Sequence, residues 1–167
     1  KNTVAVTMEE KFNRLMRFGL TGFVEYDLRR LGQFSDSVQA NAYENHLKVG
    51  ALIFKREGKA FTFDANGEIY LLGPRAGELA IFGGVQTIFP ISAKDTMLIS
   101  ARGGFFNESC DYFSTTYFSN HFKWNADFKH DFRARIEGLV ALPTRDISLG
   151  VKFENITNYV YFDTRAL

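Results

Sequence analysis

The stretch that decides the fold is HDFRARIEGLVAL, residues 130–142. Successive side chains of a β-strand point to opposite faces, and the two phases of this stretch differ in chemistry. The apolar phase consists of His130, Phe132, Ala134, Ile136, Gly138, Val140 and Leu142. The polar phase carries Asp131, Arg133, Arg135 and Glu137. An average soluble strand has about 5–6 residues, whereas a tilted strand that crosses a bilayer needs about 9–11. Length and alternation together predict a membrane-crossing strand.

The same alternation recurs along the chain and predicts nine long strands. No helical pattern of 10–15 residues separates them, so we expect an all-β, antiparallel up-and-down meander that forms part of a transmembrane β-barrel. The strands are expected near residues 3–12, 17–29, 47–53, 61–72, 79–89, 97–105, 118–128, 130–142 and 147–154.

The connections are predicted from breaks in the alternation. Turns are expected at 57–59, 73–77, 93–95 and 143–146, and residues 31–45 are the longest candidate loop. Asn66-Gly67 signals a two-residue hairpin, but the apolar phase continues through it, so one long or bulged strand over 61–72 is favoured. Pairing across the 93–95 turn is expected to bring Gly83-Gly84 close to Gly103-Gly104.

Composition narrows the function classes. The chain has 167 residues and a formal net charge of +1, which gives no electrostatic case for nucleic acid as a partner. No run of 18 apolar residues exists, so a transmembrane helix is excluded, while a barrel needs no such run. Cys110 is the only cysteine, so no internal disulfide is possible.

The sequence carries no recognised catalytic or metal-binding motif. His130 lies on an apolar face, and the residues expected opposite it on 118–128 are aromatic or small, without a serine or carboxylate. We therefore expect no enzyme activity and no cofactor.

Two sets of side chains are the candidate functional residues. An alternating soluble sheet is the alternative explanation, but long strands with charged inner rows favour a barrel with a water-filled lumen. The predicted pore-lining residues are Arg17, Glu25, Asp27, Arg29, Arg102, Lys123, Asp127, Asp131, Arg133, Arg135, Glu137, Lys152 and Glu154. The predicted lipid-facing residues are Phe118, Phe122, Trp124, Phe128, Phe132, Ile136, Val140, Ile147, Leu149, Val151 and Phe153.

Three segments carry a resemblance to a known family. They are EEKFN (9–13), NHFKWNADF (120–128) and LGVKFENITNYVYFD (149–163). Along its whole length the chain resembles the β-barrel porins of Bacteroidetes outer membranes. The resemblance implies a porin-like channel in the outer membrane of a Gram-negative bacterium, with outer-membrane lipid and other outer-membrane proteins or lipoproteins as partners. It brings no catalytic or binding residues with it.

The expected function is diffusion of small hydrophilic solutes through the barrel. A TonB-dependent transporter barrel, a non-conducting barrel subunit of an outer-membrane complex and a soluble β-rich binding domain remain alternatives. Family members are longer, the predicted strand number is odd, and no terminal aromatic residue ends the chain. We therefore expect residues 1–167 to be a single, incomplete segment of a larger barrel.

Overall fold

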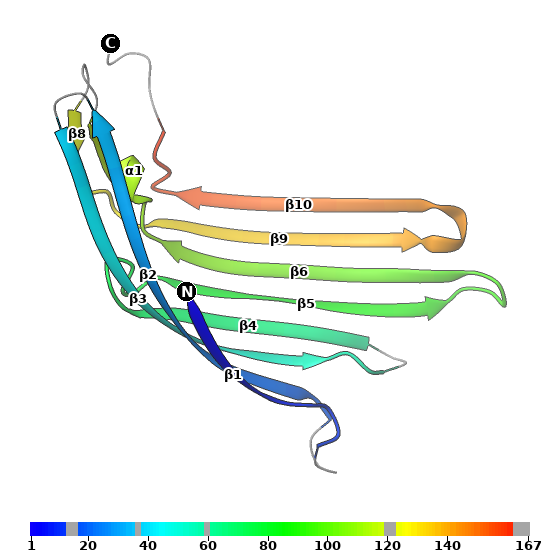
Figure 1. The fold of residues 1–167 in the computed structure, drawn as a ribbon. Coiled ribbons are helices and arrows are strands. Elements are labelled where there is room, and N and C mark those ends of the chain that lie inside the picture. The colour runs from blue at the N-terminus through cyan, green and yellow to red at the C-terminus, as the bar shows by residue number, and fades with distance from the viewer. Residues whose placement is uncertain (13–16, 36–37, 59–60, 119–122, 162–167) are drawn as a thin grey trace.

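A computed structural model describes residues 1–12, 17–35, 38–58, 61–118 and 123–161, without the side chains of residues 34, 35, 38–40 and 118. Eight strands form one antiparallel sheet in which spatial neighbours are consecutive along the main meander. The sheet bends into an open trough (Figure 1). Its strands are β1 (Asn2–Met8), β2 (Gly19–Ser35), β3 (Val38–Lys55), β4 (Phe61–Leu72), β5 (Leu79–Pro90), β6 (Thr96–Glu108), β9 (Asp131–Leu142) and β10 (Ile147–Thr157).

The predicted all-β antiparallel meander is confirmed, including its deciding strand. β9 begins one residue inside the predicted stretch and pairs with β6 on one side and β10 on the other. β1 and β10 are the two edge strands of the sheet. No helix of the described residues is long and apolar enough to cross a membrane.

The predicted strand over residues 118–128 is wrong. β6 is followed by a short helix α1 (Tyr112–Thr115) and a separate two-stranded sheet of β7 (Thr116–Phe118) and β8 (Lys123–Asn125). Trp124 makes its contacts within this segment: its ring stacks on Tyr117, with centroids 4.4 Å apart, and its Nε1 donates to the Ser114 carbonyl at 3.1 Å. Among the described residues, the main sheet therefore has eight strands rather than the nine predicted.

The predicted loop over residues 31–45 is also wrong. β2 and β3 run on as one hairpin, paired continuously from Gly19↔Phe54 to Ser35↔Val38. The alternation fades there while the backbone ladder continues, because the hydrogen bonds between the two strands join main-chain groups and do not require an apolar phase. Arg30 and Tyr43, which face each other across it, make a cation–π contact at 5.7 Å.

Other details of the meander agree with the sequence. β4 is one continuous strand through Asn66-Gly67, and its register against β3 shifts only near its end, where Leu47 pairs with Leu72 and Lys48 with Tyr70, so Leu71 of β4 is the extra residue. The two glycine pairs do meet, with Gly83 opposite Gly103. The 143–146 connection contains a single 3-10 turn, η1 (Pro143–Arg145).

The turn from Gly73 to Gly77 is fixed by backbone geometry. Both glycines have positive φ, 98° and 91°, a conformation that other residues adopt at a cost. A Cβ on Gly73 would lie 1.9 Å from the Asn45 carbonyl oxygen and 3.1 Å from His46 Nδ1. This turn is therefore packed closely against β3 at Asn45 and His46.

The two faces of the sheet differ as the alternation predicts. One apolar cross-strand row follows the convex face through all eight strands: Met8, Leu20, Ile53, Ala65, Gly83, Gly103, Ile136 and Phe153. Large apolar side chains on this face are exposed, as Ile136 at 61% and Phe153 at 65% illustrate. Contiguous exposed apolar surface of this kind marks a face that contacts lipid or another protein.

Candidate functional site

The concave face of the sheet is the candidate functional site. Its central cross-strand row consists of Phe54, Asp64, Gly84, Arg102, Glu137 and Lys152. The row lines a cavity of about 1080 Å³ that follows the trough across β3 to β10. Polar and charged residues on one continuous face, with apolar residues on the other, make this face suited to contact with water.

Ion pairs tie the charges of β9 and β10 together along this face. Arg135 lies 2.8 Å from Glu137, and Glu154 lies 3.5 Å from Lys152 and 3.8 Å from Arg133. These side chains are about one-quarter to one-half exposed, so each pair contributes little to stability, about 0–1 kcal/mol. Their main effect is to place positive and negative charges next to each other on the wall of the trough.

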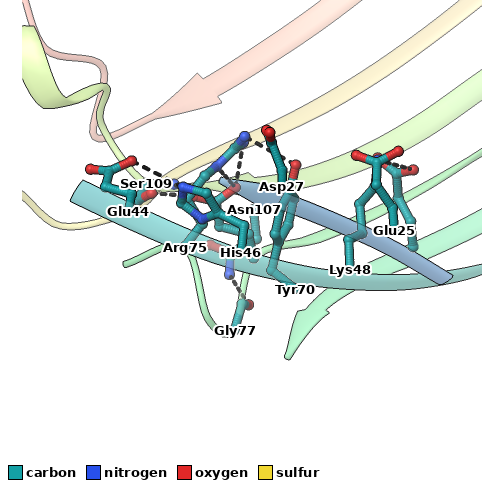
Figure 2. A network of polar contacts seen from close by, with 12 residues as sticks. Glu25, Asp27, Glu44, His46, Lys48, Tyr70, Arg75, Gly77, Asn107 and Ser109 are labelled. Atoms are coloured by element: carbon teal, nitrogen blue, oxygen red, sulfur yellow. Dashed lines mark hydrogen bonds and ion pairs between the residues drawn. The ribbon is translucent and has the colours of Figure 1, made fainter. Parts of the chain in front are cut away.

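A second cluster lies where β1, β2, β3 and β4 adjoin. Lys48 Nζ is 3.1 Å from the Glu68 carboxylate and 3.7 Å from Glu25, and Lys1 Nζ lies 3.1 Å from Glu25 on its other side. Figure 2 shows Glu25 and Lys48 pointing to the same side of the sheet as Asp27. Glu25 is only 9% exposed, so its charge is held by two cations rather than by water.

The third cluster, the rim network, consists of Tyr70, Arg75, Glu78 and Ser109. Figure 2 labels Tyr70, Arg75 and Ser109 of this network. Glu78 is 2% exposed and accepts hydrogen bonds from Arg75 Nε at 2.7 Å and from the Ser109 backbone N–H at 3.1 Å, as well as from the Ser109 hydroxyl. The Arg75 guanidinium lies 4.4 Å from the centre of the Tyr70 ring and donates to the Tyr70 hydroxyl at 3.1 Å. Burial acts to lower the pKa of Arg75, but the Glu78 carboxylate outweighs it and raises that pKa above its ordinary value.

The rim network fixes the segment that follows β6. Because Ser109 begins that segment, its two hydrogen bonds to Glu78 tie the segment to the turn between β4 and β5. His46 closes the network on the β3 side. It is 1% exposed, with Nε2 3.0 Å from the Glu44 carboxylate and its ring edge-on to Tyr70 at 6.0 Å.

The described residues between β6 and β9, 109–118 and 123–130, lie over the concave side of the β2–β3 hairpin. Gln33 Nε2 of β2 donates to the Thr116 carbonyl at 2.6 Å, which joins the hairpin to β7. A cavity of about 680 Å³ lies between this segment, the rim network and the hairpin, and Arg29, Glu44 and Asp127 are among its lining residues. The segment between β6 and β9 thus narrows the end of the trough at which the rim network lies.

Most of the predicted pore-lining residues share the concave face. They are Glu25, Asp27, Arg29, Arg102, Asp131, Arg133, Arg135, Glu137, Lys152 and Glu154. Three do not lie on the sheet: Arg17 is exposed before β2 begins, and Lys123 and Asp127 belong to the segment at the rim. Those three placements are corrections, because their predicted strands start later or do not exist.

The predicted lipid-facing residues divide in the same way. Phe132, Ile136, Val140, Ile147, Leu149, Val151 and Phe153 lie on the convex face. Trp124 and Phe128 lie instead in the segment at the rim, so their assignment to a membrane-crossing strand is wrong. Phe118 ends β7 without a described side chain, and Phe122 lies outside the described residues.

The expected position of His130 also changes. Because β9 pairs with β6, no aromatic strand faces His130; it helps to line the rim cavity, as do Ser114 and Asp131. Among the described residues, no group of three or more His, Cys, Asp or Glu side chains is arranged to hold a metal ion.

Several residues of the site were missed by sequence reasoning. Lys48 and Glu68 had a usable signal, since they occupy the polar phase of the strands predicted over 47–53 and 61–72. No sequence signal pointed to Arg75 and Glu78, because residues of a turn show no alternation. Glu78 contacts Ser109 only because β5 pairs with β6.

Comparison with known proteins gives one match. The chain matches the model of a family described as putative porins over residues 1–167, its whole length. No curated protein and no solved structure matches it.

Proposed function

The chain belongs to this putative porin family, and from that premise we propose that it contributes to an outer-membrane β-barrel through which small hydrophilic solutes diffuse. The single observation that carries the proposal is the division of one long-stranded sheet into an apolar convex face and a charged concave face. A porin wall needs both, lipid outside and water inside, at alternating positions of every strand.

The convex face supports the membrane part of the proposal. Its strands have 11–13 residues in β4, β5, β6, β9 and β10, enough to cross a bilayer at a tilt. Exposed apolar side chains such as Leu149 at 72% and Val151 at 71% would be covered by lipid tails. Outer-membrane lipid of a Gram-negative bacterium is therefore the proposed partner of this face.

The concave face supports the channel part. Arg133, Arg135 and Lys152 are balanced there by Asp131, Glu137 and Glu154 of the same two strands. This part of the face therefore has no net charge and suits neutral polar solutes as well as small ions. In the proposed channel, the rim network and the described residues between β6 and β9 form the narrow end. Longer extensions at one rim and short turns at the other are usual in such barrels, with the extended side outside the cell.

The test is whether the full-length protein folds in a membrane and conducts. We expect it to resist urea only in the presence of lipid or detergent, to migrate differently on gels before and after heating, and to produce stepwise conductance in planar bilayers. A protein that stays monodisperse and folded without detergent contradicts the membrane assignment. An intact barrel that is silent in the bilayer contradicts the channel and leaves a non-conducting subunit.

A further inference from the structure

One place on the concave wall differs from the charged rows around it. Phe82 of β5 and Phe106 of β6 have their rings stacked, with centroids 6.1 Å apart and planes 21° from parallel. Phe82 is opposite Gly104 and belongs to the same phase as Gly84 and Arg102, so it faces the trough. Its side chain is 38% exposed. Large apolar surface on a face otherwise built for water requires an explanation.

The glycines beside the rings make a bare floor for this place. A Cβ on Gly104 would lie 2.9 Å from the Phe106 ring and 2.9 Å from Phe82 Cβ, so only glycine lets the two rings close over the backbone. Gly84, in the same concave phase as Phe82, likewise contributes no side chain to the floor. The result is a hollow of about 270 Å³, near the lower end of the roughly 300–1,000 Å³ usual for ligand pockets.

The polar lining of the hollow carries two cations and two carboxylates. They are Arg102, Arg135, Asp64 and Glu137. Arg135 is engaged by Glu137 at 2.8 Å, whereas Arg102 forms no ion pair within 4 Å with any described residue and lies with its side chain over Gly84. Such a set supplies hydrogen-bond donors and acceptors side by side, with no formal excess of either charge.

These features select a class of solute. A flat aromatic pair binds a solute with an apolar face, and the balanced lining binds hydroxyl groups as both donors and acceptors while giving no advantage to an ion. A pyranose sugar has this chemistry: one face of C–H groups and a rim of hydroxyls. We propose that the hollow at Phe82 and Phe106 is a subsite for neutral ring-form sugars on the wall of the channel.

The subsite deepens the proposed function and rests on it, because the hollow shares Asp64, Arg102 and Glu137 with the cavity of the trough. A sugar held there would stay in the proposed diffusion path. Weak, fast-exchanging binding is what a channel requires, since a solute must leave as readily as it enters.

The test measures maltose binding by saturation-transfer NMR on the full-length protein folded in detergent, with the open-chain mannitol as the comparison solute. We expect a saturable signal for maltose and none for mannitol. Phe82→Leu combined with Phe106→Leu keeps apolar volume but removes the flat rings, and is expected to weaken maltose binding about tenfold. The matched control is Phe105→Leu, one position away on the convex face, which is expected to leave binding unchanged.

Absence of a saturable maltose signal in the folded wild-type protein would overturn the subsite, as would a signal that the double variant retains. Equal binding of maltose and mannitol would also overturn it, because the ring would then play no part. Conductance in planar bilayers is measured separately. Maltose binding to a folded but silent protein would contradict the proposed channel and still support the subsite.

Discussion

At the scale of single residues, charges occur in two environments that differ in energetic consequence. Lys152 and Glu154 are 49% and 26% exposed, so water screens their attraction. Glu78 is 2% exposed, and Arg75 and Ser109 donate all of the described hydrogen bonds to its carboxylate. Removing one partner of an ion pair should therefore lower the free energy of unfolding only slightly on the open wall and much more at the rim.

Glu78→Ala is expected to lower the free energy of unfolding by about 3 kcal/mol, because it leaves the Arg75 guanidinium partly buried without its carboxylate. Urea-induced unfolding of the protein in lipid vesicles, followed by tryptophan fluorescence, measures this change. Glu154→Ala is the matched control and is expected to cost less than about 1 kcal/mol. Equal losses for the two variants would contradict the special role of the rim network.

Cys110 lies between β6 and α1, and its thiol is expected to react slowly. Burial raises the pKa of Cys110 above its ordinary 9.0, and the nearby Asp131 carboxylate raises it further. Since the thiolate is the reactive form, a raised pKa leaves less of it at any given pH. The rate of alkylation by iodoacetamide should therefore rise with pH at a higher midpoint than for a free peptide thiol.

Asp131→Asn should move that midpoint downward, because it removes one of the two causes of the shift. Asp127→Asn, on the same segment, keeps Asp131 and is the comparison variant. A midpoint at or below the peptide value would show that neither burial nor Asp131 acts on the thiol as described.

At the scale of elements, β9 shows how one strand serves two environments. Ile136 points to the convex face between Gly103 and Phe153, and Leu139 lines the concave trough three positions later. Both are substantially exposed, at 61% and 39%. The exposed fraction alone therefore does not distinguish Ile136 from Leu139. They differ in the proposed surroundings, which are lipid for Ile136 and water for Leu139.

Ile136→Arg is expected to destabilise the protein folded in lipid vesicles by about 2–4 kcal/mol, because it places a charge at mid-strand on the proposed lipid face. Leu139→Arg introduces the same side chain on the opposite face and is expected to cost less than about 1 kcal/mol, since water would solvate it. Folding titrations of both variants in the same vesicles give the comparison. An equal cost for the two would contradict the assignment of lipid to the convex face.

At the scale of the whole molecule, the eight strands form a curved wall with two edges, β1 and β10. The wall concentrates charged side chains on one side, and in the proposed channel their field biases which ions pass. Arg102 has the strongest claim to influence this bias, because it lines both the trough and the hollow beside Phe82.

Arg102→Glu is expected to raise the ratio of cation to anion permeability by about twofold or more, since it exchanges a positive for a negative charge on the lumen wall. The reversal potential across a bilayer with unequal salt on its two sides measures the ratio. Lys94→Glu makes the same charge change in the exposed turn that follows β5, and it should leave the ratio unchanged. A reversal potential that responds equally to both variants would mean that Arg102 is not in the conduction path.

The accuracy of the sequence-based predictions differs between the strands of the sheet and its rim. Alternation located β4, β5, β6, β9 and β10 well, because successive residues of these strands point in turn to the apolar convex face and to the charged concave face. It failed for residues 118–128, where Tyr117 and Trp124 stack on each other and mimic the aromatic phase of a long strand. It failed again at the extended part of the β2–β3 hairpin, where both faces lack an apolar phase.

The sequence by itself determined the all-β fold, the antiparallel order and the face on which each charge of β9 and β10 lies. It did so because side-chain direction in a strand follows from position alone. Only the tertiary structure decided that β6 pairs with β9 and that Glu78 accepts hydrogen bonds from Ser109 and Arg75. It also decided that the Phe82 and Phe106 rings stack beside Gly104. Those contacts join residues far apart in the chain or on neighbouring strands, so they depend on register and curvature, which no local pattern of residues encodes.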